Sequence, residues 1–409
     1  MPFEVPSSWV WCRLEDIAYV ASGSTPDKTC FVENGVPYIK MYNLRNQKID
    51  FAYHPQYITE EVHNGKLQRS RTEVGDLIMN IVGPPLGKLA IIPTTLPQAN
   101  FNQAAVLIRP YKFKEVLVSY LKIYLEEMSE INSIATRGSA GQVNISLTQS
   151  QNMRIPIPPL NEVRRIIEEV SKYDILIDSL KQNITDIQNL IAYTKSKILD
   201  LAIHGKLVPQ DPNDEPAIEL LKRINPDFTP CDNGHYPVGW IETILGELFS
   251  HNTGKALNSS NKEGIFKDYL TTSNVYWNKF DFTAIKQMPF KESELNKCTV
   301  TKGDLLVCEG GDIGRSAIWN YDYDICIQNH IHRLRPKIDL CVPFYYYTFA
   351  YLKENNLIGG KGIGLLGLSS NALHKIEMPL PPLAEQQRIV QKIEELFSVL
   401  DNIQNALEV

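Results

Sequence analysis

The side chains that most often perform chemistry are scattered along this chain. Seven cysteines stand at positions 12, 30, 231, 298, 308, 326 and 341, and no two of them form a C-x-x-C pair. An odd number without paired spacing indicates reduced thiols, and neither a disulfide framework nor a zinc site. His330 and His332 alternate on a strand-like run, but no nearby Cys, Asp or Glu completes a metal set. A hydrogen-bonded polar face is therefore the favoured interpretation for these histidines.

Two longer motifs hint at cofactor chemistry without completing it. The segment "GIGLLG" (362–367) fits G-x-G-x-x-G, yet it follows a helical stretch, whereas a dinucleotide site needs a preceding strand. The segment "NPDF" (225–228) lacks the second proline of the Asn-Pro-Pro-aromatic pocket that methylates amino groups, and no cofactor-binding glycine loop precedes it. No carboxylate cluster with a lysine and no Ser/His/Asp set stands out either. We predict no catalytic residue, no metal and no cofactor.

Short motifs recur in the same order in both halves of the chain. The segment "IPIPPLNEVRRI" (155–166) nearly matches "MPLPPLAEQQRI" (378–389), and "GPPLGKLAI" (83–91) matches "GGDIGRSAI" (310–318). The offset between the copies stays between 223 and 231 residues. This pattern indicates tandem duplication of a unit of roughly 180–230 residues, and not a short-period solenoid. Further matches are Pro6 with Pro237, Trp9 with Trp240, and "GDLIMN" (75–80) with "GDLLVC" (303–308).

Composition places the chain among globular proteins of two to three domains. It has 409 residues, of which 43% are hydrophobic and 22% charged. No apolar run approaches the ~20 residues of a membrane span, and the first residues lack the pattern of a signal peptide, so we expect a cytoplasmic location. Strand-like runs broken by glycine and proline predict a mixed α/β (α+β) fold in each half. These runs are 36–40, 76–82, 104–109, 269–275, 304–308 and 326–334, with helical stretches near 115–130 and 342–356.

A narrow apolar seam follows each proline-rich junction. From Val163 to Leu201, twelve positions alternate three and four residues apart, and eleven of them are apolar if tyrosine counts. Six apolar positions from Ile389 to Leu407 repeat the seam at an offset of 223. Nearly six heptads favour a coiled coil, and two amphipathic helices buried in ordinary cores are the alternative.

The predicted architecture is two tandem domains joined by two long helices, which pair as an antiparallel coiled coil with pseudo-twofold symmetry. We expect the first helix over 160–204, where His204-Gly205 forms a glycine stop, and the second over 383–409. A loop rich in Pro, Asp and Asn follows the first helix. The predicted segments are a first domain (1–155), a first helix (156–205), a linker (206–235), a second domain (236–378) and a short second helix (379–409).

The two domains keep their scaffold and vary their loop tips. The segments "YIKMYNL" (38–44) and "YLTTSNV" (269–275) agree at the flanks and at one asparagine, and differ between them. Glycine turns with a single cation suit phosphate, and Tyr, Asn, Gln, Lys and Arg suit base edges. Solvated hairpin turns are the alternative. The candidate nucleic-acid contacts are Lys40, Met41, Tyr42, Asn43, Asn80, Lys88, Arg137, Gln142 and Asn144 in the first half, and Thr271, Thr272, Ser273, Asn274, Arg315 and Lys361 in the second.

Net charge does not decide whether the chain binds nucleic acid. The formal net charge of −6 would usually argue against it. However, residues 1–155 hold 15 basic and 14 acidic side chains, and residues 237–378 hold 15 of each. The acidic excess lies in the linker and the last helix, so a basic face on each domain stays open.

The sequence resembles the DNA-specificity subunit of a type I restriction–modification enzyme over essentially its whole length. The resemblance rests on the paired "W…L.DI…SGSTP" and "W…LGEL…TGK" openings, the paired "GDL" strands, the two "PxPPLxEx" junctions, and "KILDLAIHGKLVPQDPNDEPA" (197–217). It implies two target-recognition domains, each reading one half of a split, asymmetric site on double-stranded DNA. It also implies a non-catalytic subunit that docks two methylase subunits, which bind S-adenosylmethionine, and through them two ATP-driven restriction subunits.

The chain departs from the family pattern at its ends. The second helix stops at Val409, about 20 residues short of the first, and the chain begins close to the point where the linker enters the second domain. Roughly half of the first helix is then expected to lack an intramolecular partner. We therefore expect a shortened or alternative-locus form, or self-association through the unpaired part of the first helix. A stand-alone enzyme and a coiled-coil scaffold without DNA contact are the competing hypotheses.

Overall fold

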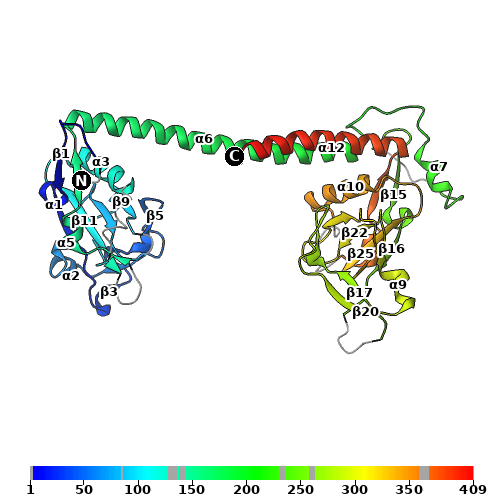
Figure 1. Cartoon of the computed structure of the whole chain (residues 1–409), viewed down its shortest axis with the longest axis horizontal. Helices are drawn as coiled ribbons and strands as arrows, with labels where there is room; N and C mark the ends of the chain where they lie inside the picture. Colours follow the sequence, from blue (N-terminus) through cyan, green and yellow to red (C-terminus); the bar gives the residue numbers. More distant parts are fainter. Residues whose placement is uncertain are drawn as a thin grey trace. The chain divides into compact units, whose positions relative to one another are not determined.

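One sheet topology occurs twice along the chain (Figure 1). In the first half an antiparallel sheet has the strand order β2-β11-β8-β9, and in the second half the order is β16-β25-β22-β23. These equal orders confirm the predicted duplication. The strands are β2 (Ala18–Ser22), β11 (Ala105–Pro110), β8 (Leu77–Asn80) and β9 (Leu89–Ile91), then β16 (Phe249–Thr253), β25 (Ile331–Pro336), β22 (Leu305–Cys308) and β23 (Ser316–Ile318).

The chain divides into unit 1, Met1–Leu180, and unit 2, Lys181–Val409. The computed structural model describes residues 3–83, 86–127, 136–137, 143–229, 235–257, 263–358 and 368–408. None of the helices in this described part combines the length and the apolar composition that a membrane span requires.

A second, mixed sheet and a strand pair complete each unit. The mixed sheets contain one parallel pair each, β10 with β4 and β17 with β24. The strand pairs β1–β14 and β15–β26 join the start of each sequence repeat to the proline-rich junction that precedes its long helix. The strands are β10 (Asn100–Phe101), β4 (Val36–Ile39), β7 (Tyr57–Ile58), β3 (Phe31–Val32), β1 (Val10–Arg13) and β14 (Arg154–Ile157) in unit 1, and β20 (Lys286–Phe290), β17 (Ile265–Leu270), β24 (Ile325–Ile327), β21 (Thr299–Val300), β15 (Ile241–Ile244) and β26 (Glu377–Leu380) in unit 2.

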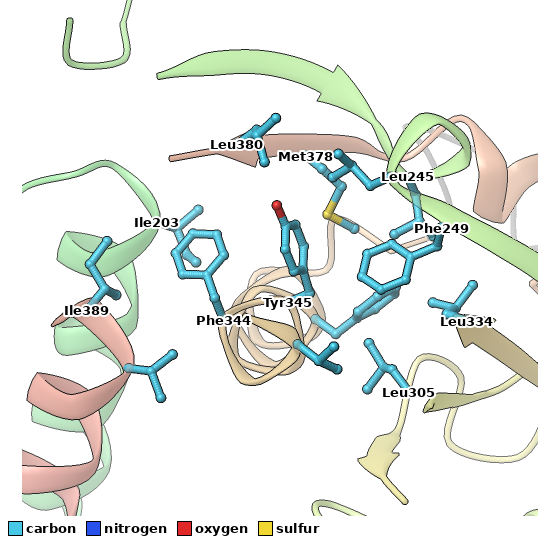
Figure 2. Close-up of a cluster of buried hydrophobic side chains, with 14 of the residues drawn as sticks. Ile203, Leu245, Phe249, Leu305, Leu334, Phe344, Tyr345, Met378, Leu380 and Ile389 are labelled. Carbon is cyan, nitrogen blue, oxygen red and sulfur yellow. The ribbon is translucent and has the colours of Figure 1, made fainter. Parts of the chain in front are cut away.

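One long helix packs on the antiparallel sheet of each unit, α3 (Lys114–Glu127) in unit 1 and α10 (Val342–Glu354) in unit 2. In unit 2, Figure 2 shows Tyr345 in a cluster that Leu305 and Leu334 of the sheet approach from one side and Ile203 and Ile389 from another. Burying an apolar side chain of this size stabilises a fold by about 1.5–3 kcal/mol. The short helices are α1 (Leu14–Ile17), α2 (Glu60–Asn64) and α5 (Leu147–Gln151), then α7 (Ala217–Lys222), α8 (Leu245–Leu248), α9 (Glu292–Cys298) and α11 (Ser370–His374).

The last part of α6 (Leu160–Ile203) pairs with α12 (Leu383–Ala406) inside unit 2. Lys195 forms an ion pair with Asp401 at 2.5 Å, and its ammonium lies 5.5 Å from the ring centre of Phe397. Toward the end of α6, Ile203 clusters with Ile389 near the start of α12. Because one sequence number rises as the other falls, the two helices run antiparallel, and Figure 1 shows them side by side. The predicted antiparallel pairing is therefore confirmed for this stretch.

The middle of α6 leaves its apolar seam exposed. Every residue from 171 to 180 is exposed, and the seam residues Tyr173, Ile177 and Leu180 are 63%, 46% and 52% exposed. Within the described residues, no other element covers this part of the seam.

Three predicted elements differ from the structure. Only the first residues of the run 269–275 belong to β17, because the rest forms the 3-10 turn η4 (Thr272–Asn274) and the start of a hairpin. The run 326–334 is two strands, β24 and β25, joined by a turn at 328–330. The expected loop 206–235 contains α7, whose Ala217 and Leu221 are buried in the unit 2 core, so local proline content underestimated this packing. The glycine stop is confirmed, since Gly205 has φ +64°.

Candidate nucleic-acid interface

A buried asparagine builds the turn that carries residues 40–42. The Oδ1 of Asn43 accepts a hydrogen bond from the backbone N–H of Lys40 at 2.9 Å. Its Nδ2 donates to the carbonyl oxygens of Asp50 at 3.1 Å and of Tyr53 at 2.7 Å. The residue is fully buried. These backbone contacts make Asn43 the residue that holds the turn in shape.

Asn274 has the same function in unit 2. Its Oδ1 accepts from the backbone N–H and from the hydroxyl of Thr271, both at 2.8 Å, and its Nδ2 donates to the carbonyl of Asp281 at 2.9 Å. The neighbouring Thr272 is half-buried and Ser273 is exposed. The turns η2 (Met41–Asn43) and η4 therefore share one internal frame and differ in the side chains they present.

A two-residue hairpin follows the turn in unit 1. Strands β5 (Leu44–Arg45) and β6 (Lys48–Ile49) are joined by Asn46 and Gln47, whose φ angles are +48° and +55°. Two consecutive left-handed residues are typical of a type I′ turn. The Gln47 Oε1 accepts a hydrogen bond from the backbone N–H of Leu89 at 2.8 Å, which fastens the hairpin to β9.

Aromatic rings and cations surround a hollow beside this hairpin, which we call the unit 1 hollow. The guanidinium of Arg45 lies 4.0 Å from the ring centre of Tyr53, and the rings of Tyr42 and Tyr53 meet edge to face at 6.3 Å. Such flat faces and cations suit stacking on bases and contact with phosphates. The lining residues are Tyr42, Leu44, Arg45, Asn46, Gln47, Tyr53 and Lys88.

The counterpart in unit 2 is arranged differently. Its hairpin consists of β18 (Val275–Tyr276) and β19 (Lys279–Phe280), and the N–H of Asn278 at its tip donates to the carbonyl of Ser316 at 3.0 Å. Here the cation comes from the neighbouring turn, because Arg315 lies 5.1 Å from the ring centre of Tyr276. The Arg315 Nη2 also donates to the Thr272 carbonyl at 2.5 Å.

Lys88 and Arg315 occupy equivalent backbone positions. The N–H of Asn80 donates to the Lys88 carbonyl at 2.9 Å, and the N–H of Cys308 donates to the Arg315 carbonyl at 2.8 Å. The Asn80 Oδ1 also accepts from the Lys88 N–H at 2.5 Å, so Asn80, which is 3% exposed, shapes this turn. The ammonium of Lys88 has no hydrogen bond or ion pair among the described residues, whereas the Arg315 guanidinium is held in place.

After the glycine-rich segment of each half, the backbone hydrogen-bonds to residues next to the turn that carries Lys88 or Arg315. The N–H of Ile145 donates to the Ile81 carbonyl at 2.9 Å, and the N–H of Leu368 donates to the Glu309 carbonyl at 3.0 Å. Of the candidates in unit 1, Tyr42 and Lys88 line the same hollow, and Asn144 forms a β-bridge with Val82 near the turn that carries Lys88. Arg137 lies in β12 (Thr136–Arg137), opposite β13 (Val143–Asn144), while its side chain and the residues Gln142 and Lys361 lie outside the described residues.

Sequence comparison missed the hairpin residues that line these faces. Arg45, Gln47 and Tyr53 in unit 1, and Tyr276 in unit 2, stand beside the predicted candidates. A signal was present, because "LRNQKI" (44–49) and "VYWNKF" (275–280) place polar tips between apolar ends. The matched motifs stopped at residues 44 and 275, and that comparison therefore left the hairpins out.

His332 and Cys298, two of the residues first considered for chemistry, are buried in the core, whereas His330 is exposed beside Glu309. His332 is fully buried, with its Nδ1 2.7 Å from His251 Nε2 and its Nε2 2.7 Å from the Leu368 carbonyl oxygen. The described residues contain no group of three or more His, Cys, Asp or Glu that could hold a metal. Burial raises the pKa of the Cys298 thiol to about 11, which disfavours the reactive thiolate. In "NPDF", the N–H of Phe228 donates to the Asn225 carbonyl at 3.0 Å to close a turn, and "GIGLLG" lies outside the described residues.

Comparison with protein families gives one match that covers most of the chain. The family model "Type I restriction modification DNA specificity domain" matches residues 6–189 and again residues 237–409. The two matched stretches correspond to the two halves that the duplication predicts.

Individual relatives and solved structures agree with this match. The chain is 24% identical to the type I restriction enzyme EcoEI specificity subunit of Escherichia coli, covering 100% of this chain and 80% of that protein. It is 23% identical to the putative type I restriction enzyme MjaX specificity subunit of Methanocaldococcus jannaschii, covering 97% and 89%. Among solved structures, a type I R-M system chain superposes with a TM-score of 0.61 at 20% identity, covering 100% and 94%. The HsdS subunit from Thermoanaerobacter tengcongensis superposes with a TM-score of 0.57 at 19% identity, covering 99% and 93%, so the likeness to solved structures extends to the fold.

Proposed function

The chain belongs to the type I restriction modification DNA specificity family, and from this premise we propose that its two units read the two halves of a bipartite, asymmetric site on double-stranded DNA. The chain is the sequence-recognition subunit of such a system and not its catalytic component. Each unit then contributes one target-recognition face, made of the η turn, the hairpin that follows it and the neighbouring β-turn with its cation.

The observation that carries this proposal is that the two η turns share one backbone structure and present different side chains. Asn43 and Asn274 hold the η turns with equivalent hydrogen bonds to the backbone. Residues 40–42 are Lys, Met and Tyr, whereas residues 271–273 are Thr, Thr and Ser. Two different base sequences present different hydrogen-bond donors and acceptors, so recognising both with the same backbone turn requires different side chains on that turn.

On each face, we assign the positioning of the DNA backbone and the reading of base sequence to different residues. We assign phosphate contact to Lys88 and Arg315, because a cation beside a glycine turn contacts the DNA backbone without reading its sequence. We assign base contact to Lys40, Met41 and Tyr42 and to Thr271, Thr272 and Ser273. Asn43, Asn274 and Asn80 hold the turns in shape. Arg137, Gln142, Asn144 and Lys361 stay predictions for the glycine-rich segments.

The partners follow from the family. We propose that the chain docks two methylase subunits, and through them two restriction subunits, in the compartment that holds the DNA, the cytoplasm. The exposed seam of α6, with Tyr173, Ile177 and Leu180, supports a further protein contact there, because coiled-coil seams seldom face water. Self-association through this seam is the alternative to contact with a different chain.

Sequencing of methylated bases in a host that expresses this chain with its methylase tests the proposal. The expected result is a methylated motif with two defined parts and an undefined spacer. A chain in which Lys40, Met41 and Tyr42 are replaced by Thr, Thr and Ser should change one part and leave the other intact, with about 1–3 kcal/mol lost for each base contact removed. A matched control is Lys112→Ala, which changes an exposed cation outside the η turn, the hairpin and the neighbouring β-turn.

Two results would contradict the proposal. One is a methylated motif with a single continuous part. The other is methyl transfer from S-adenosylmethionine to DNA by the purified chain alone, which would make the chain an enzyme in its own right.

A further inference from the structure

A three-residue turn joins the two sheets of each unit at the same place in the fold. Residues 102–104 join β10 to β11 in unit 1, and residues 328–330 join β24 to β25 in unit 2. We call these segments the unit 1 short turn and the unit 2 short turn. Their sequences are Asn-Gln-Ala and Gln-Asn-His, so the two turns carry different side chains.

A glycine packs against the backbone of each short turn. A Cβ placed on Gly23 would lie 2.1 Å from the carbonyl oxygen of Asn102, and a Cβ placed on Gly254 would lie 2.5 Å from that of Gln328. Both distances are far below van der Waals contact, so both positions require glycine. The same close approach in both units shows that the two short turns share one backbone structure.

Backbone hydrogen bonds join the unit 2 short turn to two segments that lead to candidate DNA contacts. The N–H of Gln328 donates to the Leu270 carbonyl at 2.9 Å, directly before the residues assigned to base contact. The N–H of Glu309 donates to the His330 carbonyl at 3.0 Å, directly before the glycine turn with its cation. The equivalent bonds in unit 1 are Asn102 N–H to the Ile39 carbonyl at 3.1 Å and Ile81 N–H to the Ala104 carbonyl at 2.8 Å.

Glu309 and Ile81 occupy equivalent positions beside the short turns. The Glu309 carbonyl accepts a hydrogen bond from the Leu368 N–H at 3.0 Å, and the Ile81 carbonyl accepts one from the Ile145 N–H at 2.9 Å. Their side chains differ, because Ile81 is buried in the core of unit 1, whereas the Glu309 side chain is 30% exposed. Unit 2 therefore presents a carboxylate at a position where unit 1 has a core residue.

His330 holds one oxygen of this carboxylate. Its Nδ1 lies 3.3 Å from Glu309 Oε2, and its Nε2 lies 3.5 Å from the Nδ2 of Asn329. An amide nitrogen only donates, so Nε2 accepts, and the hydrogen of the neutral ring is on Nδ1, from which it donates to Glu309. The other oxygen, Oε1, has no hydrogen bond or ion pair within the residues that the structure describes. In unit 1 the half-buried Ala104 stands at the position of His330, so these two positions cannot form such a pair.

An ionised carboxylate discriminates between bases because it only accepts hydrogen bonds. In the major groove, the N4 amine of cytosine and the N6 amine of adenine are donors, whereas guanine O6 and thymine O4 are acceptors. A carboxylate at a base edge therefore accepts a hydrogen bond from an amino base and is repelled by a keto base. The Oε1 of Glu309 is the oxygen that His330 leaves available for such a contact.

We propose that Glu309 reads an amino group, cytosine N4 or adenine N6, in the half-site bound by unit 2. His330 is a positioning residue, which holds the carboxylate by its Nδ1–H. The equivalent positions of unit 1 carry Ile81 and Ala104, so the half-site of unit 1 is read without this contact. This inference rests on the proposed function and deepens it, because it assigns one class of base to one residue outside the loop tips compared above.

Binding of the chain with its methylase to duplexes altered one base pair at a time across the unit 2 half-site tests the proposal. At one position, the unchanged chain should prefer an amino base over a keto base by about ten-fold or more. Glu309→Gln should abolish this preference at that position alone, because an amide both donates and accepts. The base that loses its advantage, cytosine or adenine, identifies which amine is read. His330→Ala should reduce the same preference partly, whereas a merely structural role would weaken binding to all duplexes equally.

Asp322→Asn is the matched control. This residue is an exposed carboxylate of the same unit, paired with Lys302 at 2.7 Å, and lies outside the η turn, the hairpin, the cation turn and the short turn. Its replacement removes the same charge and should change no base preference. The preference at the unit 1 half-site measures folding and assembly, and should stay unchanged in all three variants.

An amino preference in the unit 2 half-site that survives Glu309→Gln overturns the proposal, and so does the lack of any such preference. In both cases a two-part motif would still support the proposed function, which fails only if the motif is continuous. If Glu309→Gln also loses the unit 1 half-site, the variant is misfolded and the exposed His330→Ala decides. An unchanged preference in His330→Ala then overturns the proposal.

Discussion

The two loop-tip faces place their cations differently on the same backbone. In unit 1, the Lys88 ammonium has no partner among the described residues, and Arg45 of the hairpin lies against Tyr53. In unit 2, Arg315 occupies the position of Lys88 but donates to the Thr272 carbonyl and lies over Tyr276. Residues that align in sequence therefore differ in what they can do. Lys88 presents a point charge without a partner among the described residues, whereas Arg315 is also part of the structure of its own turn.

The largest effect is expected from removing the buried asparagine that both faces share. Asn43→Ala and Asn274→Ala each remove a buried amide that is bonded to several backbone groups. We expect a loss of about 3 kcal/mol in the free energy of unfolding for each, measured by denaturant titration. Ser273→Ala, at an exposed position of the same turn, should change stability by less than about 0.5 kcal/mol. If only one asparagine matters, the shared frame is wrong.

Arg315→Ala should sharpen the contrast between the cations. The variant loses a phosphate contact and also the side chain that holds Thr272 and Tyr276. We expect about 2 kcal/mol weaker DNA binding together with relaxed preference at one half-site, measured with cognate and half-site-altered duplexes in the presence of the methylase. Arg315→Lys should retain the salt dependence of binding without restoring the preference. An equal loss of affinity for all duplexes would show that Arg315, like Lys88, contacts only the DNA backbone.

The free energy of unfolding should depend on acid pH more strongly in unit 2 than in unit 1. Burial, His332 and His374 lower the pKa of His251 to about 4, whereas Val20 and Val106 occupy the positions of His251 and His332 in unit 1. The unfolded state binds more protons between pH 6.5 and 4, so the free energy of unfolding falls as the pH drops through this window. The full shift corresponds to about 3 kcal/mol, and solvent screening of this half-buried ring reduces the expected loss to roughly 2 kcal/mol. Thermal unfolding across this range should show unit 2 losing stability first. His251→Phe should flatten the pH dependence, and an unchanged slope would exclude His251 as its source.

The smallest effect is expected from Lys88→Ala. Because this ammonium contacts no other described group, its removal should cost about 1 kcal/mol of DNA affinity for cognate and non-cognate duplexes alike. The slope of log affinity against log salt should fall by about one unit. Fluorescence titrations at several salt concentrations measure both quantities. A changed sequence preference at constant affinity would assign Lys88 to base reading instead.

Local sequence patterns were sufficient for the scaffold. The heptad seam predicted α6 almost to the residue, since a 3.6-residue period and a glycine at 205 act along a single helix. The repeated motifs predicted the duplicated sheet, because strands that keep their order and spacing pair in the same way. The strand-like runs located β4, β8, β11 and β22 within a residue or two.

Tertiary structure alone decided which residues meet at each face. Gln47 and Leu89 are 42 residues apart and are joined only because β6 lies beside β9. The matched asparagines looked like contacts for a ligand, and the fold turned Asn43 inward, where its amide satisfies backbone groups. Trp9 and Trp240 match in sequence, yet only the fold shows that Glu385 accepts a hydrogen bond from the indole N–H of Trp240, whereas the buried indole N–H of Trp9 has no hydrogen-bond partner among the described residues. Sequence determines which residues each unit can offer, whereas the packing of distant segments determines which of them are already occupied.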